Sequence, residues 1–283
     1  MVCATPIGNL GDVTLRVLDA LRDADVIAAE DTRVTRKLLS RYDIHTPLEP
    51  YHAKNLAART PALVERIAAG AIVALVSDAG TPGVSDPGAH LVDACIDAGL
   101  LVDVLPGASA IVTALVASGL PTHAFYFGGF LPRKAGDRRR TLEKVAGLDA
   151  TLLFYESPHR AAATMASVAE VLPGRRAAMA RELTKFFAEV VRSPVEELAA
   201  MLDARELKGE IVLVVGPPEA GAIGGGASMA GESEEAVILA AYQAALAEGA
   251  TRRDAVKEAA RRCGAPRNAV YGLVTRRGPS RTF

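Results

Sequence analysis

The fold is decided by one stretch of sequence, SDAGTPGVSDPG at residues 77–88. It follows the apolar run Ile72–Ser77, which has the length and composition of a buried strand. The stretch holds three Gly, two Pro and two Asp in twelve residues. A loop of this composition costs much chain entropy, and such loops at the end of a strand commonly carry a binding function.

Two further loops of the same kind occur in the first half of the chain. TPIGNLGD at residues 5–12 follows the expected strand Val2–Thr5, and LPGASA at residues 105–110 follows Val102–Leu105. The carboxyl ends of strands in an open α/β sheet form the edge at which ligands bind. Any one loop could be a plain structural turn. Three loops at one edge favour a binding cleft.

Short apolar runs alternate with helical patterns along the first half, which is typical of an α/β domain with a mostly parallel sheet. The remaining strands expected there are Val26–Ala29 and Ala124–Phe127. Apolar spacing of three and four predicts helices at Val13–Arg22, Asn55–Ala69, Pro87–Ala98 and Ser109–Ser118. We therefore assign residues 1–130 to an amino-terminal lobe.

Residues 131–216 form the second expected lobe, with strands closer together and a more mixed sheet. Its expected strands are Thr151–Tyr155, Ala177–Arg181, Glu189–Val191 and Ile211–Val215, and its expected helices are Gly136–Val145, Pro158–Leu172 and Pro194–Ala204. Residues 217–231 are rich in Gly and predict a flexible linker. Residues 232–283 predict a helix-turn-helix-like module, with helices at Glu234–Ala247, from Thr251 to Cys263 and from Pro266 to Val274.

Charge is distributed unevenly along the chain. The net charge is −1, yet residues 251–283 carry nine Lys or Arg and two Asp or Glu. A basic tail on an acidic body indicates a polyanionic partner, and a solvated helical face is the alternative. The three Cys show no ligand spacing, and no basic leader precedes an apolar core, so we expect a cytoplasmic protein without a zinc site. No GxGxxG or GxxxxGK[ST] motif is present, which disfavours nicotinamide, flavin and P-loop sites.

The loops and several other runs resemble one known superfamily. ATPIGNLGD, AAEDTR, SDAGTPGVSDPG, PGASA, FYESPHR and RELTK occur in that order between Val2 and about Gly216. They are similar to motifs of the tetrapyrrole methylases, and most similar to the branch that methylates small-subunit ribosomal RNA. The resemblance implies a bilobal α/β fold of the class III methyltransferase type, usually dimeric, with S-adenosylmethionine in the cleft between the lobes and no metal.

The resemblance also implies which residues border the cofactor. By matching position these are Pro6, Asp78, Ala79, Gly80, Val84, Ser85, Ala108, Ser109, Ala110, Tyr155 and Leu183. The implied reaction is 2′-O-methylation of a cytidine in the decoding centre of 16S ribosomal RNA, within the 30S subunit, by a homodimer. Methylation of a tetrapyrrole or other small acceptor by the same fold is the alternative, and a non-enzymatic nucleic-acid-binding regulator is a second one.

A ribose hydroxyl needs a nearby base or a cationic stabiliser to react. Charged candidates lie in three of the motifs: Glu30, Asp31 and Arg33; Glu156, His159 and Arg160; Arg181, Glu182 and Lys185. We expect Lys185 to act as a neutral base desolvated near other cations. His159 is its rival because histidine is a common general base near neutral pH, and Glu182 is a third catalytic candidate.

The candidates for binding RNA phosphates are Arg33, Arg160 and the cluster Arg138, Arg139 and Arg140. Each has a plainer alternative. Asp31-Thr32-Arg33 could be a helix cap with a local ion pair, Pro158-His159-Arg160 an ordinary helix start, and the arginine cluster a solvated helix face.

Overall fold

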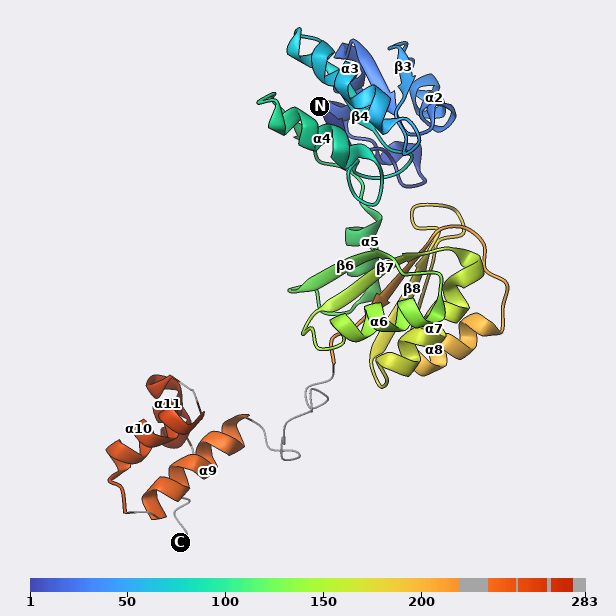
Figure 1. The fold of residues 1–283 in the computed structure, drawn as a ribbon. Coiled ribbons are helices and arrows are strands. Elements are labelled where there is room, and N and C mark those ends of the chain that lie inside the picture. The colour runs from blue at the N-terminus through green and yellow to red at the C-terminus, as the bar shows by residue number, and fades with distance from the viewer. Residues whose placement is uncertain (219–233, 248, 264–265, 277–283) are drawn as a thin grey trace. The chain divides into compact units, whose positions relative to one another are not determined.

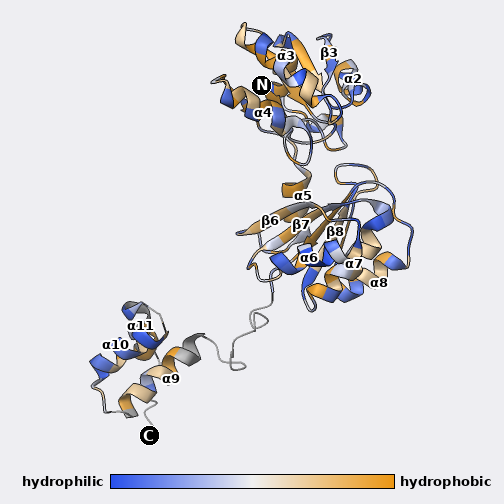
Figure 2. Ribbon diagram, in the orientation of Figure 1, coloured by the Kyte–Doolittle hydropathy of each residue, from blue (hydrophilic) through white to orange (hydrophobic). Residues whose placement is uncertain are grey.

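The computed structural model describes residues 1–218, 234–247, 249–263 and 266–276, which divide into two compact units. The first unit contains two five-stranded sheets, and the second is helical (Figure 1). Hydrophobic residues concentrate on the strands of the sheets, whereas outer helices such as α6 are mainly hydrophilic (Figure 2). Each unit is described by itself.

The first sheet has the strand order β3-β2-β4-β1-β5, and all its pairings are parallel. Its strands are β1 (Val2–Cys3), β2 (Val26–Ala29), β3 (Leu48–Pro50), β4 (Val73–Val76) and β5 (Val104–Leu105). Its helices are α1 (Leu15–Asp23), α2 (Thr32–Arg41), α3 (Leu56–Ala68) and α4 (Gly88–Asp97), with a short 3-10 turn, η1, at Leu10–Asp12.

Helices cover both faces of this sheet. Leu21 and Leu38 of α1 and α2 pack with Ile27 on one face. Leu63 and Leu91 of α3 and α4 pack with Val26 on the other. Adjacent residues of β2 thus enter opposite cores, because successive side chains of a strand alternate between its faces. Burial on both faces explains why β2 and β4 are continuously apolar.

The second sheet has the order β6-β7-β10-β8-β9. Its strands are β6 (Phe125–Phe130), β7 (Thr151–Glu156), β8 (Arg176–Arg181), β9 (Glu189–Pro194) and β10 (Ile211–Val215). β6 and β7 are parallel and the other pairs antiparallel, so the sheet is mixed, as predicted. α6 (Ala135–Val145), α7 (Pro158–Val171) and α8 (Val195–Asp203) pack on one face, and α5 (Ala110–Ser118) packs on the other.

The assignment of the fifth expected strand, Ala124–Phe127, to the first lobe was wrong. β6 pairs with β7 in the second sheet, and α5 before it packs against Leu153 and Val212 of the same sheet. α5 has the sequence AIVTALVAS, and its buried side supplies the apolar cover that this face of the second sheet needs. The chain therefore leaves the first sheet before α5. The element prediction also missed β3 and α2 altogether.

The second unit consists of α9 (Glu234–Ala247), α10 (Arg252–Cys263) and α11 (Arg267–Arg276). They share a core that includes Tyr242, Ala259 and Val270. Thr251 caps α10 by accepting a hydrogen bond from the Asp254 amide at 3.2 Å, as predicted. The expected linker at 217–231 lies, from residue 219 on, outside the described residues. No helix in the described ranges is long and apolar enough to cross a membrane.

Candidate functional site

The loops that follow β1, β4 and β5 meet at one edge of the first sheet. Thr5 and Gly80 exchange two backbone hydrogen bonds of 2.9 and 3.0 Å, which join the first loop to the second. A side chain at Gly107 would place its Cβ 2.7 Å from the Cβ of Ala4, so only glycine lets the third loop pack there. The predicted cluster of glycine-rich loops is present.

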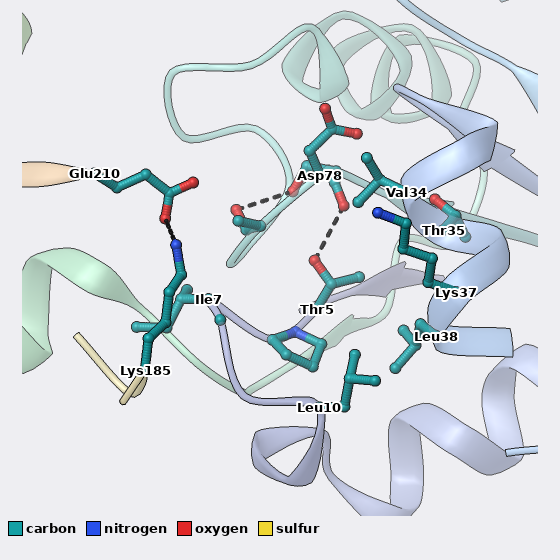
Figure 3. Close-up of a pocket in the computed structure, with 14 residues that line it drawn as sticks. Thr5, Ile7, Leu10, Val34, Thr35, Lys37, Leu38, Asp78, Lys185 and Glu210 are labelled. Atoms are coloured by element: carbon teal, nitrogen blue, oxygen red, sulfur yellow. Dashed lines mark hydrogen bonds and ion pairs between the residues drawn. The ribbon is translucent and has the colours of Figure 1, made fainter. Parts of the chain in front are cut away.

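A cavity of about 180 Å³ opens beside these loops (Figure 3). It is bordered by the loop after β1, the loop after β4, the side of α2 and two residues of the second sheet's loops. The lining residues are Thr5, Pro6, Ile7, Gly8, Leu10, Val34, Thr35, Lys37, Leu38, Ser77, Asp78, Ala79, Lys185 and Glu210. The structure thus brings Pro6, Asp78 and Ala79 together with Lys185.

Lys185 reaches the cavity from the loop between β8 and β9. Its ammonium pairs with Glu182 at 2.8 Å. It also pairs with Glu210 at 3.0 Å (Figure 3). Burial by itself would lower the pKa of Lys185, but the hydrogen bonds to the two carboxylates outweigh it and raise the pKa above its ordinary value. Carboxylates rather than other cations surround Lys185, so this arrangement favours its charged form over the expected neutral base.

Glu182 and two glycines hold Lys185 in place. The Glu182 carboxylate accepts hydrogen bonds from Lys185 and from the Glu210 amide, and the Lys185 contact lowers the pKa of Glu182. A Cβ at Gly209 would lie 2.3 Å from a Glu182 oxygen, and one at Gly8 would lie 2.7 Å from the Lys185 Cγ. Glu182 does not line the cavity, so its place in the structure is to orient Lys185.

Carboxyl groups gather where β2 and β4 end. The Asp31 amide donates to Asp78 at 2.9 Å, and the Asp78 amide approaches Glu30 at 3.4 Å. Burial, followed by the charge of Asp78, raises the pKa of Glu30. Burial also raises the pKa of Asp78, and the charges of Asp31 and Asp86 add to it. This edge of the sheet therefore favours a positively charged ligand, which would relieve the repulsion.

The other expected cofactor residues do not line the cavity. Ala110, Tyr155 and Leu183 pack around one apolar cluster at α5, and the side chain of Ser109 caps that helix. A Cβ at Gly80 would contact the Ala108 carbonyl at 3.6 Å. Ser85 lies close to Gly129 of β6, and Val84 beside it is exposed.

The motif FYESPHR is split between two environments. His159 is exposed on the first turn of α7 and does not line the cavity. Arg160 pairs with the buried Glu156 at 3.1 Å and donates to the Leu131 carbonyl at 2.6 Å. The interactions of Arg160 are thus internal, in agreement with the alternative of a structural helix start.

The three clustered arginines of α6 differ from one another. Arg138 is 7 % exposed, and its guanidinium donates to Ser167, Ala163 and Arg133. It is committed to the protein interior, so its expected RNA-binding role was wrong. Arg139 pairs with Glu143 and Glu170, and Arg140 pairs with Asp137; both remain on the surface.

α2 carries site residues that the sequence did not reveal. Asp31 caps the helix by accepting from the Arg33 amide at 2.8 Å and also pairs with the Arg33 guanidinium, so the alternative of a cap with a local ion pair holds. Lys37 and Glu210 line the cavity, and neither was a candidate. The spacing of basic residues along α2 could have pointed to Lys37. No local sequence pattern points to Glu210.

The loop that carries Lys185 also exposes two phenyl rings. Phe186 and Phe187 are 93 % and 71 % exposed, and their rings meet edge to face at a centroid distance of 5.0 Å. The Asn9 amide donates to Thr184 at 3.1 Å, which ties this loop to the first lobe. The loop therefore directs its ammonium inward and its aromatic surface outward.

The sequence profile of the tetrapyrrole (corrin/porphyrin) methylases matches residues 2–199. The chain belongs to the tetrapyrrole methylase family. Several relatives share the name ribosomal RNA small subunit methyltransferase I. The one from Mesorhizobium japonicum is 45 % identical over 95 % of this chain and 88 % of its own, and the one from Bacillus subtilis is 40 % identical over 94 % and 90 %.

Solved structures of tetrapyrrole methylases and related enzymes share the fold. Diphthine synthase matches with a TM-score of 0.59 at 17 % identity, over 76 % of this chain and 88 % of its own. Uroporphyrin-III C-methyltransferase from Thermus thermophilus, complexed with S-adenyl homocysteine, matches with a TM-score of 0.53 at 20 % identity, over 76 % and 95 %. At these identities the likeness establishes the bilobal class III methyltransferase fold, as predicted.

Proposed function

We propose that this tetrapyrrole methylase transfers a methyl group from S-adenosylmethionine to the 2′-hydroxyl of a cytidine in 16S ribosomal RNA. The observation that carries the proposal is the cavity in which the Lys185 ammonium of the second lobe faces the glycine-rich loops of the first. The names of the relatives support a small-subunit RNA as the substrate. The decoding centre, the assembled 30S subunit, a homodimeric enzyme and a cytoplasmic location complete the proposal.

The chemistry of the site fits the cofactor. S-adenosylmethionine carries a sulfonium and an ammonium, and bound there it supplies an activated methyl group. Glu30 and Asp78 offer carboxylates whose pKa is raised by burial and, to a lesser extent, by neighbouring carboxylates. Pro6 and Ala79 supply apolar walls, and Gly80 keeps the adjoining backbone uncovered. We assign the nearby Ala110, Tyr155 and Leu183 to the adenosine because they form one apolar cluster.

The chain's own contribution to the reaction lies in orientation and charge. The loops fix one side of the cavity, and the loop of Lys185 fixes the other, which favours alignment of two reactants. The ammonium of Lys185 stabilises negative charge that develops on the ribose oxygen as its proton passes to solvent water and the methyl group replaces it. Glu182 and Glu210 keep that ammonium charged and in place.

The test is transfer of a labelled methyl group. The purified protein, labelled S-adenosylmethionine and 30S subunits from cells that lack the gene are incubated, and the label is mapped on the 16S RNA. We expect label on the ribose of one decoding-centre cytidine, with naked 16S RNA as the parallel substrate. Label on a base, or on another RNA, would overturn the assignment. No label together with measured cofactor binding would redirect the search to tetrapyrroles and other small acceptors.

A further inference from the structure

α2 presents a row of cations on its solvent side. Thr35, Leu38 and Leu39 form the buried face of this helix. Arg33, Arg36, Lys37 and Arg41 are all exposed, and at about 100° per residue they fall on the opposite face. We call these four residues the α2 ridge.

The cations of the α2 ridge lack the acidic neighbours that other helices of this chain provide. On α6, Arg139 pairs with Glu143 and Arg140 with Asp137, and on α10, Arg261 pairs with Glu258 at helical spacing. No acidic residue lies within α2, and the capping Asp31 pairs only with Arg33. Among the described residues, the side chains of Arg36 and Lys37 form no ion pair or hydrogen bond.

The arrangement of the α2 ridge costs stability. Like charges three and four residues apart on a helix repel by a few tenths of a kcal/mol per pair. Arg33 faces Arg36 and Lys37 at these spacings, and Lys37 faces Arg41. Arg36 and Lys37, at the centre of the ridge, have no carboxylate partner in the described part of the chain to offset this repulsion, which indicates an external anion.

The position of the α2 ridge connects it to the candidate site. Lys37 lines the cavity together with Val34 and Leu38 of the same helix, across from Lys185 (Figure 3). The ridge and the cavity are therefore contiguous, and a long anion bound along the ridge would reach the cavity. A nucleic-acid backbone supplies phosphates in a row, which a free small anion does not.

We propose that the α2 ridge binds successive phosphates of the RNA strand and leads the target nucleotide into the cavity. The inference rests on the proposed function and names a binding surface for its substrate. It also moves the main RNA contact from α6 to α2, because the exposed α6 arginines already have carboxylate partners and the central ridge cations do not.

The test compares two double variants with the wild-type full chain. R36Q/K37Q removes the unpaired ridge cations, and R139Q/R140Q removes two paired cations of α6 as the matched control. Binding to naked 16S RNA and to 30S subunits is measured by filter retention over a series of salt concentrations, without cofactor. Circular dichroism verifies that each variant is folded.

We expect R36Q/K37Q to bind more weakly and to lower the slope of log affinity against log salt by about 1.5, since each phosphate contact contributes roughly 0.7 to 0.9. The control is expected to change the slope by much less. An unchanged slope for R36Q/K37Q, or a change seen with 30S subunits but absent with naked RNA, would overturn the ridge as an RNA site while leaving the proposed methylation intact. A wild-type chain that binds neither RNA would overturn both.

Discussion

At the scale of single residues, the environment of Lys185 decides its chemistry. Two carboxylates within 3.0 Å turn a side chain that sequence reasoning cast as a base into a fixed cation. A cation at that place would activate a hydroxyl by stabilising negative charge on its oxygen, whereas a base would activate it by removing its proton. The motif RELTK names Lys185 and Glu182, but Glu210, which completes the arrangement, lies 25 residues further along the chain.

Replacing Lys185 tests this role directly. Lys185→Met should lower kcat by about 100-fold, the usual cost of one lost stabiliser of transition-state charge, while Lys185→Arg should retain part of the activity. Because the pKa of Lys185 is raised, the wild-type rate should not increase through the neutral range on its account and should decline only in alkali. The pH dependence of kcat distinguishes the two roles of Lys185. A rate that rises as Lys185 loses its proton would show that it acts as a neutral general base.

The carboxyls at the β2–β4 edge predict a pH-dependent cofactor affinity. The raised pKa of Glu30 and Asp78 means that the folded protein retains these protons more strongly than the unfolded chain does. Their charged forms therefore cost stability at neutral pH, and that cost disappears as the pH falls through the raised pKa. Affinity for a cationic cofactor changes in the opposite sense and should decrease over the same range.

Calorimetric titration of S-adenosylmethionine at several pH values measures that effect. Glu30→Gln should weaken binding at neutral pH and flatten its pH dependence. Glu65→Gln, at an exposed position of α3, is the matched control and should change neither. An affinity that is constant down to the range where ordinary carboxyls titrate would refute the role of this acidic edge.

At the scale of elements, much of the fold was predictable because buried strands carry a strong local signal. β2 and β10 have the bounds expected from their apolar runs. β6 has the same kind of signal, but its place in the second sheet depends on pairing with β7, which no local pattern encodes. α2 was missed because cations at four of its ten positions obscure the helical spacing of its buried residues Thr35, Leu38 and Leu39.

The candidate site was predictable to a similar degree. Pro6, Asp78 and Ala79 were found because glycine-rich loops after strands have a local signature. The burial of Arg138 could not be predicted, because it depends on contacts with Ser167 and Ala163 of the next helix. The pairing of Arg160 with Glu156 was equally hidden, since the sequence does not show that Glu156 is buried.

The contact between the first loop and the loop of Lys185 predicts a large effect from one methyl group. Gly8→Ala would put Cβ 2.7 Å from the Lys185 Cγ at a φ of +152°, so the lysine must shift. A displacement of about 1 Å in a positioning group can cost roughly 100-fold in rate. We expect kcat to fall well beyond any loss of cofactor affinity, as measured by turnover and calorimetry.

The control for Gly8 is Gly136→Ala on α6, where an added Cβ meets nothing within 4 Å. It should leave turnover unchanged and raise stability by a few tenths of a kcal/mol, because alanine is the better helix former. Equal turnover for wild type and Gly8→Ala would show that the loop contact does not set the position of Lys185.

At the scale of the whole molecule, the two units have separate cores. No hydrophobic cluster of the described residues combines side chains from 1–218 with side chains from 234–276. The helical unit is small, and its core rests on residues such as Tyr242, Ala255 and Val270. A core of this size supplies only a few kcal/mol of stability, on the order of 3 to 5.

Val270→Asp should therefore unfold the helical unit alone. Val270 is fully buried, and burial of an unpaired carboxylate costs more than so small a core provides. Scanning calorimetry should show loss of one transition with the melting temperature of the two-sheet unit unchanged, and Arg253→Gln, at an exposed position of α10, should retain both. A joint shift of both transitions would show that the units are energetically coupled.

Tyr155 packs between Phe127 and Phe130, with ring centroids 4.9 and 5.5 Å away, in a chain that contains no Trp. At the long-wavelength edge of protein absorption only the indole of tryptophan is excited. Because the chain has no tryptophan, it does not absorb there. Phe130→Trp, at a position where the phenyl ring is largely exposed, would introduce one fluorophore that alone emits under this excitation. If adenosine binds beside Tyr155 as proposed, the colour and intensity of this emission would change on cofactor binding, without any label on RNA or cofactor.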